Sequence, residues 1–263
     1  MTNIYRFGKI AGGLCLIYYL IWGVGQLVSD FVRGNQLLRI GKLEEAVDAY
    51  QKAIAHDPSF RWSHYKLGEA LTQLGRLEEA VVAYKKAISY NPHLYFVYQK
   101  LGEIMHKLGC VEEAVRCFRK AIDFNPKPLE PNPDLILYWA YQKLGETLHP
   151  LWRWEEAVTA FRQAIAVNPT AKWSYFHLGQ VLAQQEKWSE VIASYQKAIE
   201  LNLTEPQVFW GLGRALEAMK RWDEAIATYQ KTIELNVHQY QSYQYLGNLL
   251  LRQRQWTEAV AAH

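Results

Sequence analysis

The chain has 263 residues, of which 50% are hydrophobic and 14% aromatic, which is enough apolar material to exclude a largely disordered protein. The net charge of +3, without any block rich in Lys and Arg, argues against nucleic acid binding. The three cysteines form no CxxC pair, which argues against a zinc site and against a disulfide framework.

The first predicted element is an apolar segment near the N-terminus. Residues 10–28 carry no charge, and Arg6 and Lys9 precede them. As a helix rising 1.5 Å per residue, this segment would span about 28 Å, close to the thickness of a bilayer core. Its four glycines weaken such a helix. Three interpretations stay open: a membrane anchor, which we favour and assign to residues 1–28, a cleaved signal peptide, and a helix packed on the first repeat.

From Leu27 onward the sequence repeats itself with a period of 34 residues, the distance from Gly68 to Gly102. Small and aromatic residues recur in register with these glycines, as Ala114, Phe118 and Ala121 do after Gly102. Each unit carries two runs with apolar stripes at helical spacing, so it predicts two antiparallel helices. The glycines of the successive units are Gly34, Gly68, Gly102, Gly145, Gly179, Gly213 and Gly247.

Tight turns are predicted between the two helices of every unit. In the first three units the turn residue is Gly41, Gly75 or Gly109. In the later units the same place is taken by Trp152, Glu186, Lys220 and Arg254. A tryptophan follows two residues later in each of these units, and we expect it to pack over the turn as a core residue; these are Trp154, Trp188, Trp222 and Trp256.

Prolines predict where several helices end or begin. Asn125-Pro126 ends a second helix, because proline disfavours helical geometry in the residue before it. Pro150 is expected to stop its first helix one residue early. Residues 129–137 form a Pro-rich insertion that predicts a stiff loop, and Asn132-Pro133-Asp134 resembles a helix start, so the first helix after it is expected to be longer than its equivalents. The insertion separates repeats one to three (27–128) from repeats four to seven (138–263), of which the last is incomplete.

This pattern resembles the tetratricopeptide repeat (TPR) family of the bacterial multi-repeat type, over roughly nine tenths of the chain. The resemblance implies an all-α superhelical solenoid whose concave face is lined by the first helices. It implies a non-catalytic scaffold that binds a partner peptide or protein in this groove, without a cofactor. The alternative is that the repeats are the substrate-recognition arm of a larger enzyme, such as an O-GlcNAc transferase-like glycosyltransferase, whose catalytic domain is absent from this chain.

Aromatic residues recur at two repeat positions that we expect to face the groove. They predict a stacking ladder for an extended peptide, and the alternative is that the rings pack between repeats. The predicted groove residues are Phe31, Asn35, Trp62, Tyr65, Phe96, Lys100, Trp139, Trp173, Phe176 and Trp210. Family members that hold chaperone tails use a clamp of lysines, asparagines and an arginine. Asn35 and Lys100 fit that clamp. Phe31, Lys66 and Phe96 depart from it, which argues against capture of a C-terminal carboxylate.

Two E-x-x-H pairs, Glu103 with His106 and Glu146 with His149, stand at the same repeat position. Di-metal bundles use such pairs, but only where four helices close around the metal. We therefore predict no metal site. Each glutamate follows a lysine by three residues, as Glu103 follows Lys100, which predicts local ion pairs on a solvated surface.

The seventh unit stops inside its second helix, at His263. Solenoids normally finish with a polar cap. We therefore expect that the natural chain continues, or that this end frays or self-associates with another subunit. The predicted location is a bacterial membrane, anchored by a single pass through residues 10–28, with a cytoplasmic protein as the alternative; the orientation stays open because Lys and Arg favour neither flank.

Overall fold

The computed structural model describes residues 25–125, 135–235 and 243–251. Most of the predicted membrane anchor and the C-terminal residues 252–263 lie outside these ranges. The chain divides into two compact units, unit 1 (Met1–Asn125) and unit 2 (Pro126–His263), and each is described by itself. The described residues of both units are helical and form no strand, which confirms the all-α prediction.

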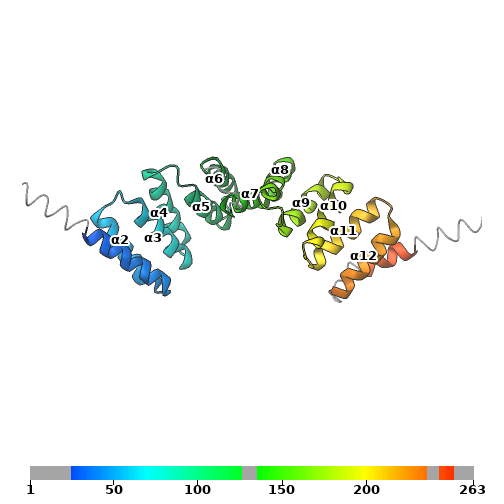
Figure 1. Cartoon of the computed structure of the whole chain (residues 1–263), viewed down its shortest axis with the longest axis horizontal. Coiled ribbons are helices and arrows are strands. Elements are labelled where there is room, and N and C mark those ends of the chain that lie inside the picture. Colours follow the sequence, from blue (N-terminus) through cyan, green and yellow to red (C-terminus); the bar gives the residue numbers. More distant parts are fainter. Residues whose placement is uncertain (1–24, 126–134, 236–242, 252–263) are drawn as a thin grey trace, which may run out of the picture. The chain divides into compact units, whose positions relative to one another are not determined.

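The first described helix of unit 1 covers residues 25–39. Five further helices follow it (Figure 1): α2 (Leu43–His56), α3 (Arg61–Gln73), α4 (Leu77–Tyr90), α5 (Tyr95–Lys107) and α6 (Val111–Asp123). The second helices α2, α4 and α6 each carry two glutamates in the first turn, where a negative charge stabilises the helix dipole.

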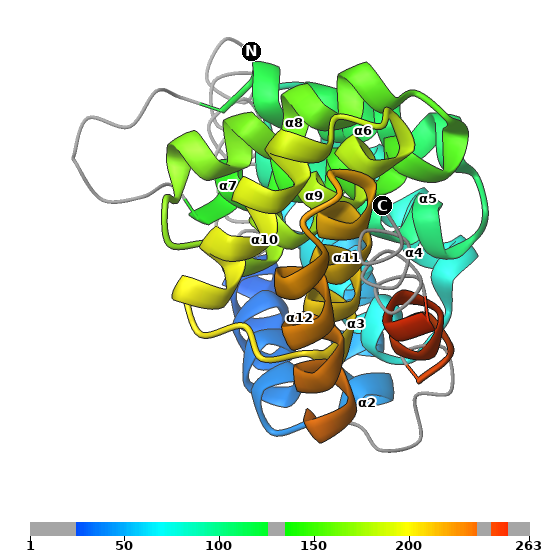
Figure 2. The same ribbon diagram turned by 90° about the vertical axis from the view of Figure 1, so that its right-hand side faces the viewer.

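Unit 2 continues the same alternation, with α10, α11 and α12 running side by side in Figure 2. Its elements are α7 (Leu135–Leu148), the 3₁₀ helix η1 (His149–Leu151), α8 (Trp154–Val167), α9 (Lys172–Gln184), α10 (Trp188–Glu200), α11 (Pro206–Ala218) and α12 (Trp222–Leu235). A further described helix covers residues 243–251.

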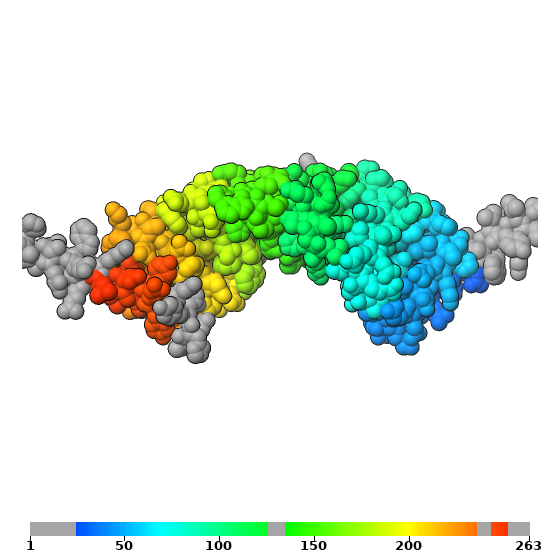
Figure 3. Space-filling view, turned by 180° about the vertical axis from the view of Figure 1, so that it is seen from behind, coloured from blue at the N-terminus to red at the C-terminus, as the bar shows by residue number. Residues whose placement is uncertain are grey.

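The helices pack as consecutive pairs. Each first helix makes its most extensive contacts with the second helix of its own pair: α3 with α4, α5 with α6, α7 with α8, α9 with α10, and α11 with α12. Each second helix within a unit then contacts the next first helix, as α2 contacts α3 and α8 contacts α9. The space-filling view shows neighbouring helices of a unit packed against each other (Figure 3). The antiparallel pairs predicted from the repeat are therefore present.

A glycine and an aromatic ring bring the two helices of each pair together. A Cβ atom added to the glycine would lie only 2.6 to 2.8 Å from a ring carbon of the second helix. The rings themselves are at most 3% exposed. The pairs are Gly34 with Tyr50, Gly68 with Tyr84, Gly102 with Phe118, Gly145 with Phe161, Gly179 with Tyr195, and Gly213 with Tyr229. Only a residue without a side chain allows this close approach.

The turns within the pairs have left-handed backbone at the predicted positions. Gly41, Gly75 and Gly109 have φ between +75° and +78°. Trp152, Glu186 and Lys220 take the same conformation with φ of 61°, 56° and 59°. The tryptophans that follow are the first residues of α8, α10 and α12 and are partly buried, so the prediction of core residues at Trp154, Trp188 and Trp222 was wrong.

Helix α7 differs from the other first helices at both ends. It starts at Leu135, three residues earlier in the repeat than α3, α5, α9 and α11, as Asn132-Pro133-Asp134 predicted. Residues 135–137 of the expected insertion therefore belong to α7. The α-helix stops at Leu148, two residues before the place where its equivalents end, and Pro150 lies in the 3₁₀ turn η1. The predicted early stop is confirmed, and it is one residue larger than expected.

None of the helices within the described ranges combines the length and the apolar character that crossing a bilayer requires. The membrane-anchor prediction falls mainly on residues 10–24, which are outside those ranges.

Candidate peptide-binding surfaces

The predicted groove residues of unit 1 contact one another. Trp62 of α3 and Phe96 of α5 stack with ring centroids 5.8 Å apart and planes 5° apart. The ring of Tyr65 meets both edge-on, with centroids 6.2 Å from Trp62 and 5.1 Å from Phe96. All three side chains are partly buried. These rings join consecutive first helices, which is the packing alternative that the sequence left open.

Charged groups surround the aromatic rings of unit 1. Tyr65 Oη donates a hydrogen bond of 2.7 Å to Glu69 Oε1, and Lys66 Nζ lies 2.7 Å from Glu69 Oε2. Burial, and then the bond to Glu69, raise the pKa of Tyr65 above its usual range. Lys100 Nζ lies 3.6 Å from Glu103 Oε2. The ion pairs predicted between residues three apart are thus present. One of them involves Lys100, which was predicted to bind a partner.

Phe31 and Asn35 also take part in packing. The ring of Phe31 lies 5.2 Å from that of Phe60, edge to face, and 6.0 Å from that of Tyr50. Tyr50 Oη donates a hydrogen bond of 2.9 Å to Asn35 Oδ1. The amide oxygen of Asn35 is therefore engaged inside the first helix pair.

Unit 2 presents its aromatic residues differently. Trp139 of α7 is 45% exposed and Trp173 of α9 is 42% exposed. Lys143 Nζ lies 5.9 Å from the ring of Trp139, and Trp173 meets the buried Phe176 edge-on at 5.8 Å. Large indole surfaces therefore face water on two first helices of this unit.

A cavity of about 360 Å³ lies within unit 2, mainly between α9 and α11. We call it the α9–α11 pocket. Arg214 lies above the ring of Trp210, with its guanidinium carbon 5.0 Å from the centroid. Trp210 Nε1 is buried and has no hydrogen-bond partner among the described residues. The lining residues are His149, Gln180, Ala183, Gln184, Trp188, Tyr195, Gln207, Trp210, Gly211 and Arg214, and none of them is acidic.

Burial of the imidazole, and then the nearby His177, lower the pKa of His149. Since both effects disfavour the protonated ring, His149 contributes a neutral imidazole to the pocket wall near pH 7. The pocket therefore offers hydrogen-bond donors and apolar rings, with Arg214 as its charged group.

The repeat register shows what the groove prediction missed. Arg214 stands where Glu69, Glu103 and Glu146 stand in earlier first helices, one residue after the repeat glycine. Gly211 stands where those helices have Lys66, Lys100 and Lys143. The sequence therefore indicated the pocket through a change from glutamate to arginine at the repeat position of Arg214. The predicted groove set held only Trp210 from this pocket, because it was chosen from aromatic residues and from the clamp pattern.

The two E-x-x-H pairs belong to different units. Glu146 lies 2.7 Å from Lys143 Nζ, accepts a bond of 2.9 Å from Gln142 Nε2, and is 3.8 Å from His177 Nε2. Within the described ranges, no group of three or more His, Cys, Asp or Glu residues is arranged to hold a metal ion.

Comparison with protein families agrees with this fold. The family model of the C-terminal domain of cilia and flagella-associated protein 70, a TPR family, matches residues 62–263. A second model, that of the TPR repeat, matches residues 34–75. No curated protein matches the chain in sequence.

Several solved TPR structures share the fold at low sequence identity. The C-terminal part of a TPR repeat-containing protein from Cytophaga hutchinsonii superposes with a TM-score of 0.70, at 18% identity over 88% of this chain and 92% of that one. YrrB, described as a TPR protein with an unusual peptide-binding site, has a TM-score of 0.66 at 19% identity, over 76% of this chain and 98% of its own. PilF of Pseudomonas aeruginosa has a TM-score of 0.64 at 15% identity, over 86% and 99%. Since the first family model covers most of the chain, the protein belongs to the tetratricopeptide repeat family described as the C-terminal domain of cilia and flagella-associated protein 70.

Proposed function

We propose that the protein is a non-catalytic interaction scaffold that binds an extended segment of a partner protein on the first helices of unit 2. The observation that carries this proposal is the exposure of Trp139 and Trp173, 45% and 42%, on α7 and α9. Exposed indoles leave apolar surface in water, and burying that surface in a complex contributes about 25 cal/mol per Å². Tryptophan and arginine are also the residues that most often dominate the binding energy at interfaces.

Unit 1 has a weaker claim to the same role. Its rings Trp62, Tyr65 and Phe96 already stack on one another, so their apolar surface is largely used in packing. Asn35 and Lys100, the two residues that fit a clamp, are hydrogen-bonded or ion-paired within the unit. We assign to these residues the stability of the first-helix surface, and to Trp139 and Trp173 the contact with the partner.

The α9–α11 pocket supplies the polar part of this surface. Trp210 Nε1 is buried and has no acceptor among the described residues, and leaving a buried donor unpaired costs about 1–3 kcal/mol. A peptide carbonyl or side-chain oxygen of the partner would remove that cost. YrrB, a protein of this fold, is described as having a peptide-binding site, and we extend peptide binding to this chain.

The test compares tryptophans of the two units. A partner is first isolated with the intact chain, and its affinity for purified variants is then measured by calorimetry. Trp139→Ala and Trp173→Ala should each weaken binding by about 1–3 kcal/mol and leave the melting temperature nearly unchanged. Trp62→Ala is the matched control: it should lower the melting temperature, because it removes the stack on Phe96. If Trp139→Ala and Trp173→Ala lower stability without changing affinity, the rings are structural and the proposal fails.

We further propose that residues 10–28 tether the scaffold to a membrane, because this largely apolar segment carries no charged residue and is long enough to cross a bilayer core.

A further inference from the structure

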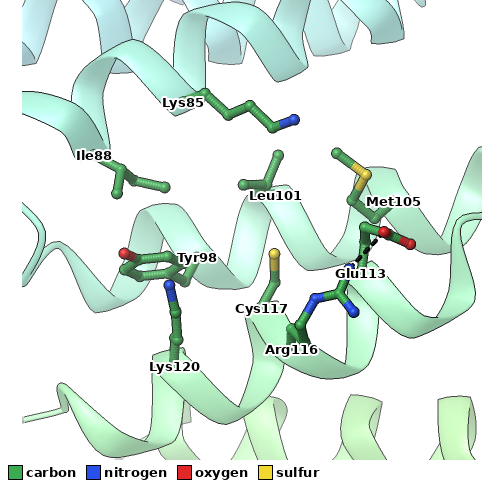
Figure 4. A pocket seen from close by; sticks show the side chains of 9 residues that line it. All are labelled: Lys85, Ile88, Tyr98, Leu101, Met105, Glu113, Arg116, Cys117 and Lys120. Carbon is green, nitrogen blue, oxygen red and sulfur yellow. Dashed lines mark hydrogen bonds and ion pairs between the residues drawn. The ribbon is translucent and has the colours of Figure 1, made fainter.

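A second cavity lies in unit 1, between the second helices α4 and α6 and above the first helix α5 (Figure 4). Its volume is about 270 Å³. We call it the α4–α6 pocket. It is lined by Lys85, Ile88, Tyr98, Leu101, Met105, Glu113, Arg116, Cys117 and Lys120. Pockets for drug-sized ligands are commonly about 300–1,000 Å³, so this cavity is suited to a single large side chain.

The floor of the pocket is apolar. Tyr98, Leu101 and Met105 lie at positions i, i+3 and i+7 of α5 and form one face of that helix. Phe96 and Lys100, which belong to the first-helix surface of unit 1, lie on the opposite side of α5. The α4–α6 pocket is therefore separate from the first-helix surface of unit 1, and the proposed peptide-binding surface lies on first helices of unit 2.

Positive charge surrounds this floor. Figure 4 shows Lys85 on one side of the pocket, and Arg116 and Lys120 on the other. Lys120 Nζ lies 5.3 Å from the ring centroid of Tyr98. Arg116 pairs with Glu113 at 2.5 Å, whereas neither Lys85 nor Lys120 forms an ion pair with any residue that the structure describes. Two lysines at the pocket thus have no carboxylate partner within those ranges.

The equivalent place in unit 2 shows why Lys85 has no carboxylate partner among the described residues. Lys85 and Glu113 stand at the same repeat positions as Arg162 of α8 and Glu190 of α10. In unit 2 these two residues form an ion pair at 2.5 Å across consecutive second helices. In unit 1 the glutamate pairs with Arg116 instead, and the residue at that position in unit 2 is Ala193. Arg116 therefore removes the acid that would otherwise neutralise Lys85.

Cys117, which points toward the middle of the pocket, adds no negative charge (Figure 4). Burial raises the pKa of its thiol to about 11, against the opposing effect of Lys120, Lys85 and Arg116. Near pH 7 the thiol is neutral and behaves as part of the apolar wall.

We propose that the α4–α6 pocket binds an acidic amphipathic segment of a partner protein, with one apolar side chain in the cavity and carboxylates beside Lys85 and Lys120. The apolar floor favours burial of a Leu or Phe side chain. The two lysines favour flanking Asp or Glu residues in the partner. These acids would take the place of Glu113, which pairs with Arg116 and not with Lys85. Apolar side chains next to acids are what a short helix or an extended acidic peptide can present to such a pocket.

The methionines of the chain provide a direct test. There are three, and Met105 lines the pocket whereas Met219 lies in unit 2. The intact protein is labelled with ¹³C in its methionine methyl groups and titrated with the probe acetyl-Glu-Glu-Leu-Phe-Glu-Glu-amide. The Met105 signal should shift with saturation and the Met219 signal should stay in place. Two control peptides should bind at least about tenfold more weakly, one with Gln for every Glu and one with Ser for Leu and Phe.

Variants of exposed lysines separate binding at the pocket from general attraction to a basic protein. Lys85→Ala and Lys120→Ala should each weaken probe binding about two- to fivefold. Lys86→Ala is the matched control, since it removes the same charge from the same helix outside the pocket, and it should leave affinity unchanged. An unshifted Met105 signal, equal binding of the Gln peptide, or equal effects of Lys85→Ala and Lys86→Ala would each overturn the proposal.

Discussion

At the residue scale, the turns show two ways of making the same backbone conformation. Unit 1 uses glycine at Gly41, Gly75 and Gly109, for which a φ near +75° carries no steric cost. Unit 2 places Glu186 and Lys220 in the same region, where a side chain costs roughly 1–2 kcal/mol. The packing of the helices on either side must supply that energy.

Replacing such a residue with glycine should therefore stabilise the fold. Glu186→Gly is expected to raise the free energy of unfolding by about 1 kcal/mol, because it removes the left-handed strain and Glu186 is exposed. Gly75→Ala should change it by a similar amount in the opposite direction, although a Cβ there would meet open space. Urea denaturation of both variants measures the two effects. Equal stabilities of Glu186→Gly and the natural protein would show that the turn is not strained.

His149 gives stability a dependence on pH. Burial lowers the pKa of the folded imidazole below its ordinary value of 6.5. Folding then disfavours protonation, so the contribution is present above pH 6.5 and is lost as the pH falls below that value. The free energy of unfolding should decrease more steeply between about pH 6.5 and 5 in the natural protein than in His149→Gln. Identical profiles for the natural protein and His149→Gln would contradict the assignment.

The sequence predicted where the turns lie better than it predicted how far side chains are exposed to solvent. The turn residues Gly75 and Glu186 lie where the period of 34 placed them, because backbone conformation follows the local repeat. The same period predicted core positions for Trp154 and Trp188, and these are only partly buried. Exposure depends on which side chains a neighbouring helix presents, and the residue type at a single repeat position does not contain that information.

At the element scale, one close approach between helices, that of α11 to α10, could not be predicted from the repeat period. Gly211 of α11 is not a repeat glycine, yet a Cβ there would lie 2.7 Å from a ring carbon of Tyr195 in the preceding pair. Tyr195 is thus held between Gly179 of its own pair and Gly211 of the next. The joint between α10 and α11 depends on a glycine that the period could not identify.

Gly211→Ala should accordingly destabilise unit 2. Forcing a methyl group against the buried ring of Tyr195 is expected to cost about 1–3 kcal/mol. Gly41→Ala is a useful comparison, since it adds the same atom in open space and its cost comes from φ alone. Thermal unfolding followed by circular dichroism compares the two. A smaller loss in Gly211→Ala than in Gly41→Ala would show that α11 shifts freely on Tyr195.

At the scale of the whole molecule, one repeated sequence pattern builds two chemically different units. In unit 1 the first-helix aromatic rings stack on each other, and the second helices line a pocket whose Lys85 and Lys120 form no ion pair with the residues that the structure describes. In unit 2 the indoles of Trp139 and Trp173 are exposed, and Arg162 with Glu190 bridges consecutive second helices. The fold follows from the glycine and aromatic residues shared by the repeats. The candidate sites follow from residues at which the repeats differ, so the period alone predicts the fold but does not identify the candidate sites.

The apolar N-terminal segment leads to a prediction about the whole molecule, namely that it is attached to a membrane. Residues 10–28 carry no charge, and their length suits a bilayer core. If they anchor the protein, the intact chain should stay with the membrane pellet during carbonate extraction, whereas a chain beginning at Gly25 should be released. Ile17→Arg places a charge near the middle of the segment, which costs about 2.5–3.5 kcal/mol in a bilayer, and should shift the intact chain toward the released fraction. The alternative, a helix packed on the first repeat, predicts that the intact chain is released and that Ile17→Arg lowers its melting temperature instead.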